Sequence, residues 1–400
     1  MPPLAHDEIR RFWPVILACF CMAVFAWGFG FYGQSVYLAE LRRLHGWSSA
    51  NITSATTGMY LGGAILMPFI HGAMRRYDAR AVLVGGTLLL GVGACGFARA
   101  TAVWHLYAAA MAMAAGWAAT TGTAIATVLS FWFDHRRGLA ISLALNGASA
   151  SGFIVAPALV NLSQAIGLRT AVPIAVVTGW CVLVPLLLFC ISRQPSRLTA
   201  AVATDAAADP RPAFDQKADV LRDARFWSVA APFALALAAQ VGFIIHMVAF
   251  LIPTLGPAGT GFAVSLASLA AMLGRIALGL VIDRLHQRAT SAISFASQAV
   301  GLALMLLWPG QPWAMYGGCL LFGASVGNVI TLPAILIQRE FAARSFGLLI
   351  GLSGATGQFT LALGPALFGV LRDLAGSYGP VLGLCIGLQL TAAALVLRRV

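Results

Sequence analysis

The chain has 400 residues, of which 60% are apolar and 10% are charged, and its formal net charge is +12. Soluble domains carry about 25% charged and roughly 45–50% apolar residues, so this composition excludes a pair of ordinary soluble domains. No loop concentrates aromatic and basic residues, which argues against a nucleic-acid-binding protein despite the basic charge.

Apolar runs recur along the whole chain, and each is long enough to cross about 30 Å of hydrocarbon. Because lipid offers the backbone no hydrogen-bonding partners, runs of this length must be helices. The sequence therefore predicts an all-α membrane protein with twelve transmembrane helices, at about 13–38, 50–73, 81–99, 104–131, 138–163, 170–192, 226–252, 260–282, 289–308, 313–337, 346–371 and 378–397.

The two halves of the chain repeat one another. Arg-Phe-Trp opens both halves, at 11–13 and 225–227, and a Gly-Leu helix start followed by Pro-Ala-Leu occurs at 138–159 and 347–367. These landmarks, together with a loop glycine at 72 and 279, recur in one order at offsets of 207 to 214 residues. Duplicated halves are typical of transporters, so we expect two pseudo-symmetric six-helix bundles.

The bundles are predicted at 1–192 and 225–400, joined by a polar linker at 193–224 that contains a short amphipathic helix. The side of the membrane that holds both termini carries 19 of the 25 basic residues. The positive-inside rule places that side in the cytoplasm, and the expected location is a bacterial cytoplasmic (inner) membrane.

One loop between predicted helices carries a charged motif. Residues Gly279, Asp283 and Arg284 belong to a Gly-x-x-x-Asp-Arg-x-x-x-Arg pattern, which resembles the loop signature of the major facilitator superfamily. In that superfamily the loop latches the inward-closed state. In the equivalent loop of the first half, Gly72 and Arg80 remain, but Arg76 stands where the acid belongs, so the resemblance implies a latch in the second half only.

A finer resemblance is to the monocarboxylate-transporter-like members of this superfamily. It rests on Gly28-Phe29-Gly30-Phe31-Tyr32-Gly33-Gln34-Ser35, on residues 132–140, which include Arg136 and Arg137, and on His246 with Gly274-Arg275. The resemblance implies a carrier of a small organic anion that works by alternating access.

The 13 acidic residues fall in loops or at predicted helix ends, while one base, Arg275, lies within a span. An arginine in a span costs at least about 2.5–3.5 kcal/mol on insertion scales, so it is a functional candidate. Its guanidinium fits a carboxylate with two hydrogen bonds. Ser268 and Ala271 share its helix face and leave room for a ligand; the alternative is that Arg275 extends toward the cytoplasmic headgroups.

His246 is the second candidate, as a neutral hydrogen-bond donor to substrate or as a proton carrier. The remaining substrate-binding candidates are polar or aromatic residues within spans, each of which also fits a role in helix packing. They are Gln34, Trp117, Asn328, Tyr32 and Asn146.

The sequence departs from the animal proton-coupled monocarboxylate transporters at two positions. Gln34 stands where those proteins have a lysine, and Ala271 stands where they have an acid. Proton coupling through His246, coupling through the substrate's own proton, and the absence of coupling stay open.

We therefore expect a secondary transporter of a monocarboxylate-like anion, a monomer in contact with lipid, with no cofactor, no metal and no catalytic residues. The runner-up function is efflux of drugs or other small molecules on the same fold. A membrane sensor is a third alternative, but the longest loop, of about 32 residues, is short for an output region.

Overall fold

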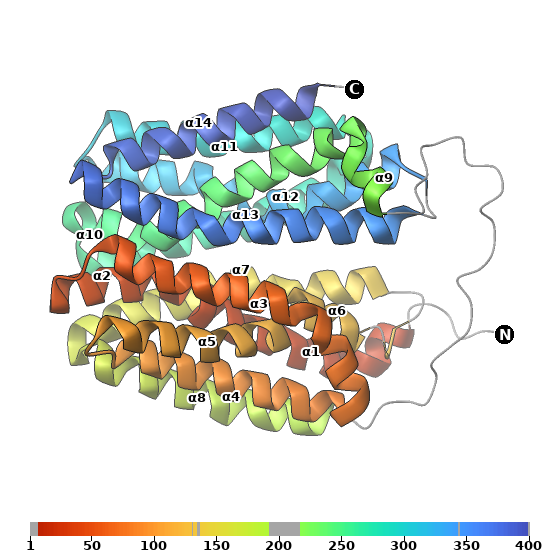
Figure 1. Ribbon diagram of the computed structural model, residues 1–400, viewed down its shortest axis with the longest axis horizontal. Helices are drawn as coiled ribbons and strands as arrows, with labels where there is room; N and C mark the ends of the chain where they lie inside the picture. Colours follow the sequence, from red (N-terminus) through yellow and green to blue (C-terminus); the bar gives the residue numbers. More distant parts are fainter. Residues whose placement is uncertain (1–6, 130, 134–136, 192–216, 343–344, 399–400) are drawn as a thin grey trace. The chain divides into compact units, whose positions relative to one another are not determined.

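The computed structural model describes residues 7–129, 131–133, 137–191, 217–342 and 345–398 (Figure 1). Within these ranges all the regular secondary structure is helical. The chain separates into two compact units, Met1–Thr199 with Leu255–Ser265, and Ala200–Thr254 with Leu266–Val400. The segment Leu255–Ser265, which the sequence assigns to the C-terminal bundle, therefore groups with the N-terminal unit.

The N-terminal half of the chain contains eight α-helices and one π-helical turn within the described residues. They are α1 (Asp7–Trp27), the π-turn η1 (Gly28–Tyr32), α2 (Gly33–His45), α3 (Ser49–Tyr77), α4 (Ala79–Ala98), α5 (Val103–Thr120), α6 (Gly122–Leu129), α7 (Arg137–Ile166) and α8 (Leu168–Cys190). The first predicted span thus corresponds to α1, η1 and α2 in succession.

The C-terminal half begins with a short helix and contains one very long one. Its elements are α9 (Lys217–Arg222), α10 (Ala224–Val281), the 3₁₀ turn η2 (Ile282–Arg284), α11 (Gln287–Leu307), α12 (Pro312–Glu340), α13 (Phe346–Ala375) and α14 (Gly379–Leu397). Residues 193–216 of the predicted linker lie outside the described residues. Helix α9 lies within the part of the linker that the sequence predicts to be a short amphipathic helix.

Among the described residues, ten helices are long and apolar enough to cross a membrane, compared with the twelve predicted spans. One difference is only in the assignment: α10 runs across a kink at Gly256, whose backbone is not helical (φ 66°, ψ 176°), and the two predicted spans lie on either side of this kink. The other is α3, which is not among the ten. Six of its first nine residues, Ser49–Thr57, carry hydroxyl or amide side chains, which lower its hydropathy.

The two halves repeat one another in their helix contacts as well as in sequence. In the N-terminal unit, Gly62 of α3 approaches Ala114 of α5, and a Cβ atom on Gly62 would lie 3.0 Å from the alanine methyl. In the C-terminal unit, Gly274 of α10 lies against the carbonyl of Ala324 on α12. Both contacts join the second predicted span of a half to its fourth, and small residues at both sites permit the close approach.

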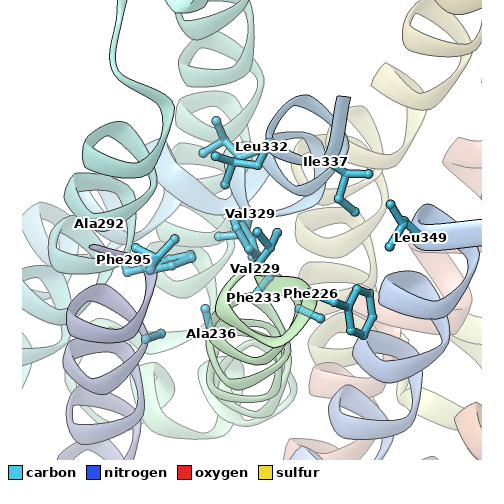
Figure 2. Packing of buried hydrophobic residues seen from close by; sticks show 14 of the residues in the cluster. Phe226, Val229, Phe233, Ala236, Ala292, Phe295, Val329, Leu332, Ile337 and Leu349 are labelled. Carbon is cyan, nitrogen blue, oxygen red and sulfur yellow. The ribbon is translucent and has the colours of Figure 1, made fainter. Parts of the chain in front are cut away.

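A hydrophobic cluster fills the end of the C-terminal unit near the start of α10 (Figure 2). Phe226 and Phe233 of α10 and Phe295 of α11 are 0–4% exposed, and the Phe233 and Phe295 rings meet edge to face at 5.1 Å. Val220 of α9 is also fully buried in this cluster. The short helix expected to lie on the inner leaflet therefore packs one side chain into the protein.

Three buried glutamines link three helices of the C-terminal unit. Gln389 of α14 donates to the carbonyl of Ala236 (3.2 Å) and to Gln298 of α11 (2.6 Å), and Gln298 donates to Gln240 of α10 (2.8 Å). All three side chains are at most 1% exposed. Because the backbone carbonyl can only accept, it fixes the direction of the whole amide chain.

Replacing Gln298 with leucine should therefore destabilise the protein. The change leaves the Gln240 oxygen without its donor and removes one acceptor from Gln389, with an expected cost of about 1–3 kcal/mol. Thermal unfolding in detergent measures this loss. Gln311→Leu, at an exposed position, is the matched control. A Gln298→Leu protein that unfolds at the same temperature as the control would show that the amide chain does not stabilise the unit.

Candidate functional site

The first span contains a break in its α-helical hydrogen bonding. Residues Gly28–Tyr32 form a π-turn in which the N–H of Gly33 donates to the carbonyl of Gly28. The carbonyl of Gly30 accepts a hydrogen bond from the Tyr60 hydroxyl of α3 (3.0 Å). π-Turns inside α-helices occur frequently at functional sites, and this one lies in the segment that carries the finer resemblance.

Trp117 of α5 packs directly against this turn. Its ring lies 5.3 Å from Trp27 and 5.5 Å from Tyr60, measured between centroids. Trp117 is 5% exposed, and its indole nitrogen is buried without a hydrogen-bond partner in the described part of the chain. These three rings come from three helices of one unit.

Gln34, a predicted substrate contact, is 1% exposed and is held on both sides of its amide. Its oxygen accepts from the Thr56 hydroxyl (2.8 Å), and its nitrogen contacts the sulfur atoms of Met59 (3.6 Å) and Met113 (3.7 Å). Thioethers are weak acceptors, so the amide N–H groups remain the part of Gln34 best able to gain from a ligand.

Two further candidates of this unit lie on different helices. Tyr32 is 5% exposed, its ring meets Phe31 edge to face at 5.2 Å, and its carbonyl accepts from Ser35 (2.6 Å). Asn146 lies on α7, and its amide oxygen is buried without a partner among the described residues. The structure therefore groups Gln34 and Trp117 around α3 and α5, whereas Asn146 lies on another helix.

In the C-terminal unit, Arg275 lies on α10 and is partly buried. A Cβ atom on Gly327 of α12 would lie 2.8 Å from the Arg275 Nε and 3.0 Å from its Cβ. The side chain thus runs along the bare backbone of α12. Ser268 and Ala271, predicted to share its helix face, are 2% and 1% exposed.

Asn328 follows Gly327 on α12 and is 7% exposed. Its amide nitrogen donates to Ser294 of α11 (3.4 Å), and its amide oxygen is buried without a partner in the described ranges. Two of the predicted binding residues, Arg275 and Asn328, thus meet the same stretch of α12. An unused buried acceptor suits a ligand that carries a hydroxyl or a protonated group.

His246 has different neighbours. It is 0% exposed, its Nδ1 lies 3.4 Å from the Tyr378 hydroxyl, and its Nε2 lies 3.4 Å from the carbonyl oxygen of Pro365. Since that carbonyl can only accept, Nε2 carries the proton there, and Nδ1 can accept from the tyrosine. Tyr378 also packs against Phe250 and the guanidinium of Arg372. In this conformation His246 is enclosed by protein groups.

The loop motif of the second half contains a turn followed by a buried arginine. Asp283 and Arg284 lie in η2, and Arg284 is exposed; the side chain of Asp283 and the surroundings of Gly279 are outside the described part. Arg288, the last arginine of the motif, is 4% exposed and donates to both Glu340 oxygens, at 2.7 and 2.6 Å.

The remaining donors of Arg288 are also used. They reach the carbonyls of Val396 and Arg398, both at 2.9 Å, and the Ser228 hydroxyl at 2.8 Å. All five N–H groups of the guanidinium thus have acceptors, on α10, α12 and the end of α14. From the sequence, Arg288 was predicted to be one of the charged residues of the loop. No sequence pattern indicated its hydrogen-bond acceptors, which lie far from it along the chain.

The first-half loop has its own ion pair. Arg80 contacts Asp78 (3.3 Å between Nη2 and Oδ2), and Asp78 also accepts from the Arg80 backbone N–H (3.2 Å), at the start of α4. The acid that the motif would have at position 76 is absent, and Asp78, two residues later, pairs with Arg80. Gly72 lies in α3 and Arg137 begins α7, but the structure does not describe the surroundings of either residue. Arg136 lies outside the described residues.

One sequence prediction is wrong. Glu40, expected at a helix end or in a loop, lies inside α2 and is 2% exposed. The helix continues to His45 before Gly46 ends it with a left-handed backbone. Arg43 donates to one carboxylate oxygen (2.8 Å) and Gln164 of α7 donates to the other (2.6 Å), which satisfies the buried charge.

No group of three or more metal-binding side chains occurs within the part of the chain that the structure describes. A family model described as Major Facilitator Superfamily matches residues 18–365. The chain belongs to the major facilitator superfamily. Members of this superfamily are transporters rather than enzymes, so the chain is an integral membrane protein of the transport class.

Relatives and solved structures agree with this family assignment. The chain is 28% identical over 344 residues to monocarboxylate transporter 11 of Mus musculus, covering 78% of this chain and 70% of the relative. It is 23% identical over 390 residues to the uncharacterized MFS-type transporter YcxA of Bacillus subtilis, covering 94% and 92%. A crystal structure of a nucleoside transporter NupG variant has the same fold, with a TM-score of 0.74, 12% identity and coverage of 96% and 98%.

Arg288→Met should destabilise the C-terminal unit, because it leaves the Glu340 carboxylate and two backbone carbonyls without their donors. Breaking a buried ion pair typically costs about 3–5 kcal/mol, and the partial exposure of Glu340 places the expected loss at the lower end. Thermal unfolding in detergent measures it. Arg222→Met, exposed on α9, should change little. Adding Glu340→Gln to Arg288→Met should recover part of the loss; no recovery would contradict the role of the pair.

Proposed function

We propose that this protein is a secondary transporter that carries a small monocarboxylate-like organic anion across a bacterial cytoplasmic membrane, with both termini in the cytoplasm. The family gives the transport class. Relatives named as monocarboxylate transporters support the substrate class. The observation that carries the proposal is the place of Arg275, a guanidinium on a membrane-spanning helix, beside the bare α12 backbone at Gly327.

Arg275 binds the substrate carboxylate in this proposal. A guanidinium offers a carboxylate two parallel hydrogen bonds and a permanent charge, which together select anions over neutral analogues. Asn328, on the same stretch of α12, donates to Ser294 and keeps its amide oxygen for a second polar group of the ligand. A change in conformation then exposes Arg275 alternately to each side of the membrane.

Coupling to a proton would involve His246. His246 has a side chain that can bind a proton, but its two nitrogens face Tyr378 and Pro365 in this conformation. A role in transport therefore requires a second conformation in which the Tyr378 contact opens. In such a conformation the imidazole nitrogen Nδ1 is the atom that gains a proton.

Efflux of lipophilic cations is the runner-up function. Recognition of a cation inside a membrane protein usually uses a carboxylate. Glu40 is the acid that is less than 9% exposed among the described residues, and both its oxygens already accept hydrogen bonds from Arg43 and Gln164. The charge distribution thus favours an anionic substrate over a cationic one.

Replacing Arg275 with alanine should lower uptake of radiolabelled carboxylates into proteoliposomes by at least a hundredfold, because the loss of a charged hydrogen-bonding group costs about 3 kcal/mol in binding. Arg275→Lys should retain part of the uptake but raise KM, since a lysine forms one point contact.

Arg169→Ala, exposed at the start of α8, is the matched control and should transport normally. Gly327→Val should mimic the loss of Arg275, because the added side chain occupies the space of the guanidinium stem. Uptake at the wild-type rate by folded Arg275→Ala protein would contradict the proposed site.

A further inference from the structure

The C-terminal unit carries a short helix that the proposed function leaves unexplained. Helix α9 has six residues, and a helix of this length is not stable by itself in water. Val220 holds it to the protein, because its side chain is fully buried in the hydrophobic cluster. The indole N–H of Trp227 on α10 also donates to the carbonyl of Leu221 (2.7 Å). Residues 217–227 therefore form one ordered element, called the α9 segment below.

The outer face of the α9 segment carries apolar side chains. Leu221 is 45% exposed and Trp227 is 37% exposed, whereas the neighbouring Val220 and Phe226 are fully buried. Because the Trp227 nitrogen already donates to a carbonyl, the exposed part of its ring is apolar. Tryptophan is enriched at the boundary between membrane and water. These two side chains thus suit the level where lipid headgroups meet acyl chains.

The same segment exposes three basic side chains, Lys217, Arg222 and Arg225. None of them has an ion-pair partner among the residues that the structure describes. Of the two acids in the segment, Asp223 accepts a hydrogen bond from the Arg225 backbone N–H (2.6 Å) and caps the start of α10. Asp219 is exposed. The segment therefore presents three cations and one exposed anion around its two apolar side chains.

The hydrogen bonds of Arg288 show which end of the C-terminal unit holds the α9 segment. Arg288 begins α11 and donates to Ser228 near the start of α10, to Glu340 at the end of α12 and to the carbonyl of Arg398 after α14. These helix ends meet next to the α9 segment, where a membrane-spanning helix begins (Figure 1). Arg284 and Arg398 are also exposed, while Glu340 is paired with Arg288. The described part of this end thus complements an anionic surface.

We propose that the α9 segment binds the headgroups of anionic phospholipids. Lys217, Arg222 and Arg225 contact the lipid phosphates, and a guanidinium fits a phosphate with two parallel hydrogen bonds. Leu221 and Trp227 enter the boundary of the acyl chains. Each basic residue beside a membrane-spanning helix strengthens binding to anionic lipid by roughly fivefold. This site is independent of the transported substrate, and in the proposed orientation its lipids belong to the cytoplasmic leaflet.

Hydrogen–deuterium exchange of the whole protein in nanodiscs tests this proposal, read by mass spectrometry on peptides that cover 217–227. Nanodiscs of phosphatidylcholine alone are compared with nanodiscs that also contain phosphatidylglycerol. The amides of the α9 segment in wild-type protein should exchange at least threefold more slowly with phosphatidylglycerol, because a bound lipid stabilises the ordered segment against local opening. Salt at 1 M shortens the Debye length to about 3 Å and should remove most of this difference.

The double variant Arg222→Gln/Arg225→Gln should lose the effect of phosphatidylglycerol, with exchange in α12 unchanged. The control Arg99→Gln/Arg169→Gln removes the same charge at exposed positions elsewhere and should keep the effect.

Equal exchange of the α9 segment in the two lipids by wild-type protein would overturn the proposal, as would an undiminished effect in the double variant. Protection by glycerol phosphate added to phosphatidylcholine nanodiscs would also overturn it, because it would indicate a site for a soluble phosphate. None of these outcomes bears on uptake of carboxylates, so the proposed function is tested separately.

Discussion

The requirement that a chain in lipid satisfies its own backbone hydrogen bonds determines most of this structure. This requirement makes every apolar run a helix. A break in a helix is costly unless another group supplies the hydrogen-bonding partner that the backbone has lost. At the π-turn of the first span, the Tyr60 hydroxyl supplies a partner for the Gly30 carbonyl. The same tyrosine packs against Trp117, so a backbone requirement also places a ring beside a residue that the sequence predicts to bind substrate.

Polar side chains within the helices obey the same constraint. Gln240, Gln298 and Gln389 satisfy one another in a chain whose direction one carbonyl fixes, and Arg288 uses every donor of its guanidinium. These hydrogen bonds hold helices together, and the Gln389 amide oxygen is the one atom of these four side chains left buried without a partner among the described residues. The buried atoms without partners, such as the Trp117 nitrogen and the Asn328 oxygen, are the ones with capacity left for a ligand.

The fold class, the family and most helix positions were predictable from the sequence, because hydropathy and the internal repeat are local or periodic signals. As the sequence predicted, α10 holds two spans, which lie on either side of Gly256, whose backbone is not helical. The hydropathy of α3 falls short of the other spans because its start is rich in hydroxyl side chains.

The candidate site was predictable in its residue types but not in its contacts. Arg275 was identifiable because an arginine within an apolar run is rare, and the structure adds the bare backbone at Gly327. The enclosure of His246 by Tyr378 and Pro365 joins residues more than a hundred positions apart, and so does the pairing of Glu40 with Gln164. No spacing within the sequence signals such pairs.

The central claim is that a guanidinium within the membrane binds a carboxylate. Ligand-induced thermal stabilisation of the purified protein tests it most directly, because a ligand that binds the native state raises the unfolding temperature by an amount that grows with its affinity and concentration. Acids such as benzoate, pyruvate and lactate are compared with their amides, which have the same shape and no charge. The account predicts stabilisation by at least one acid and none by its amide; equal stabilisation by both would contradict it.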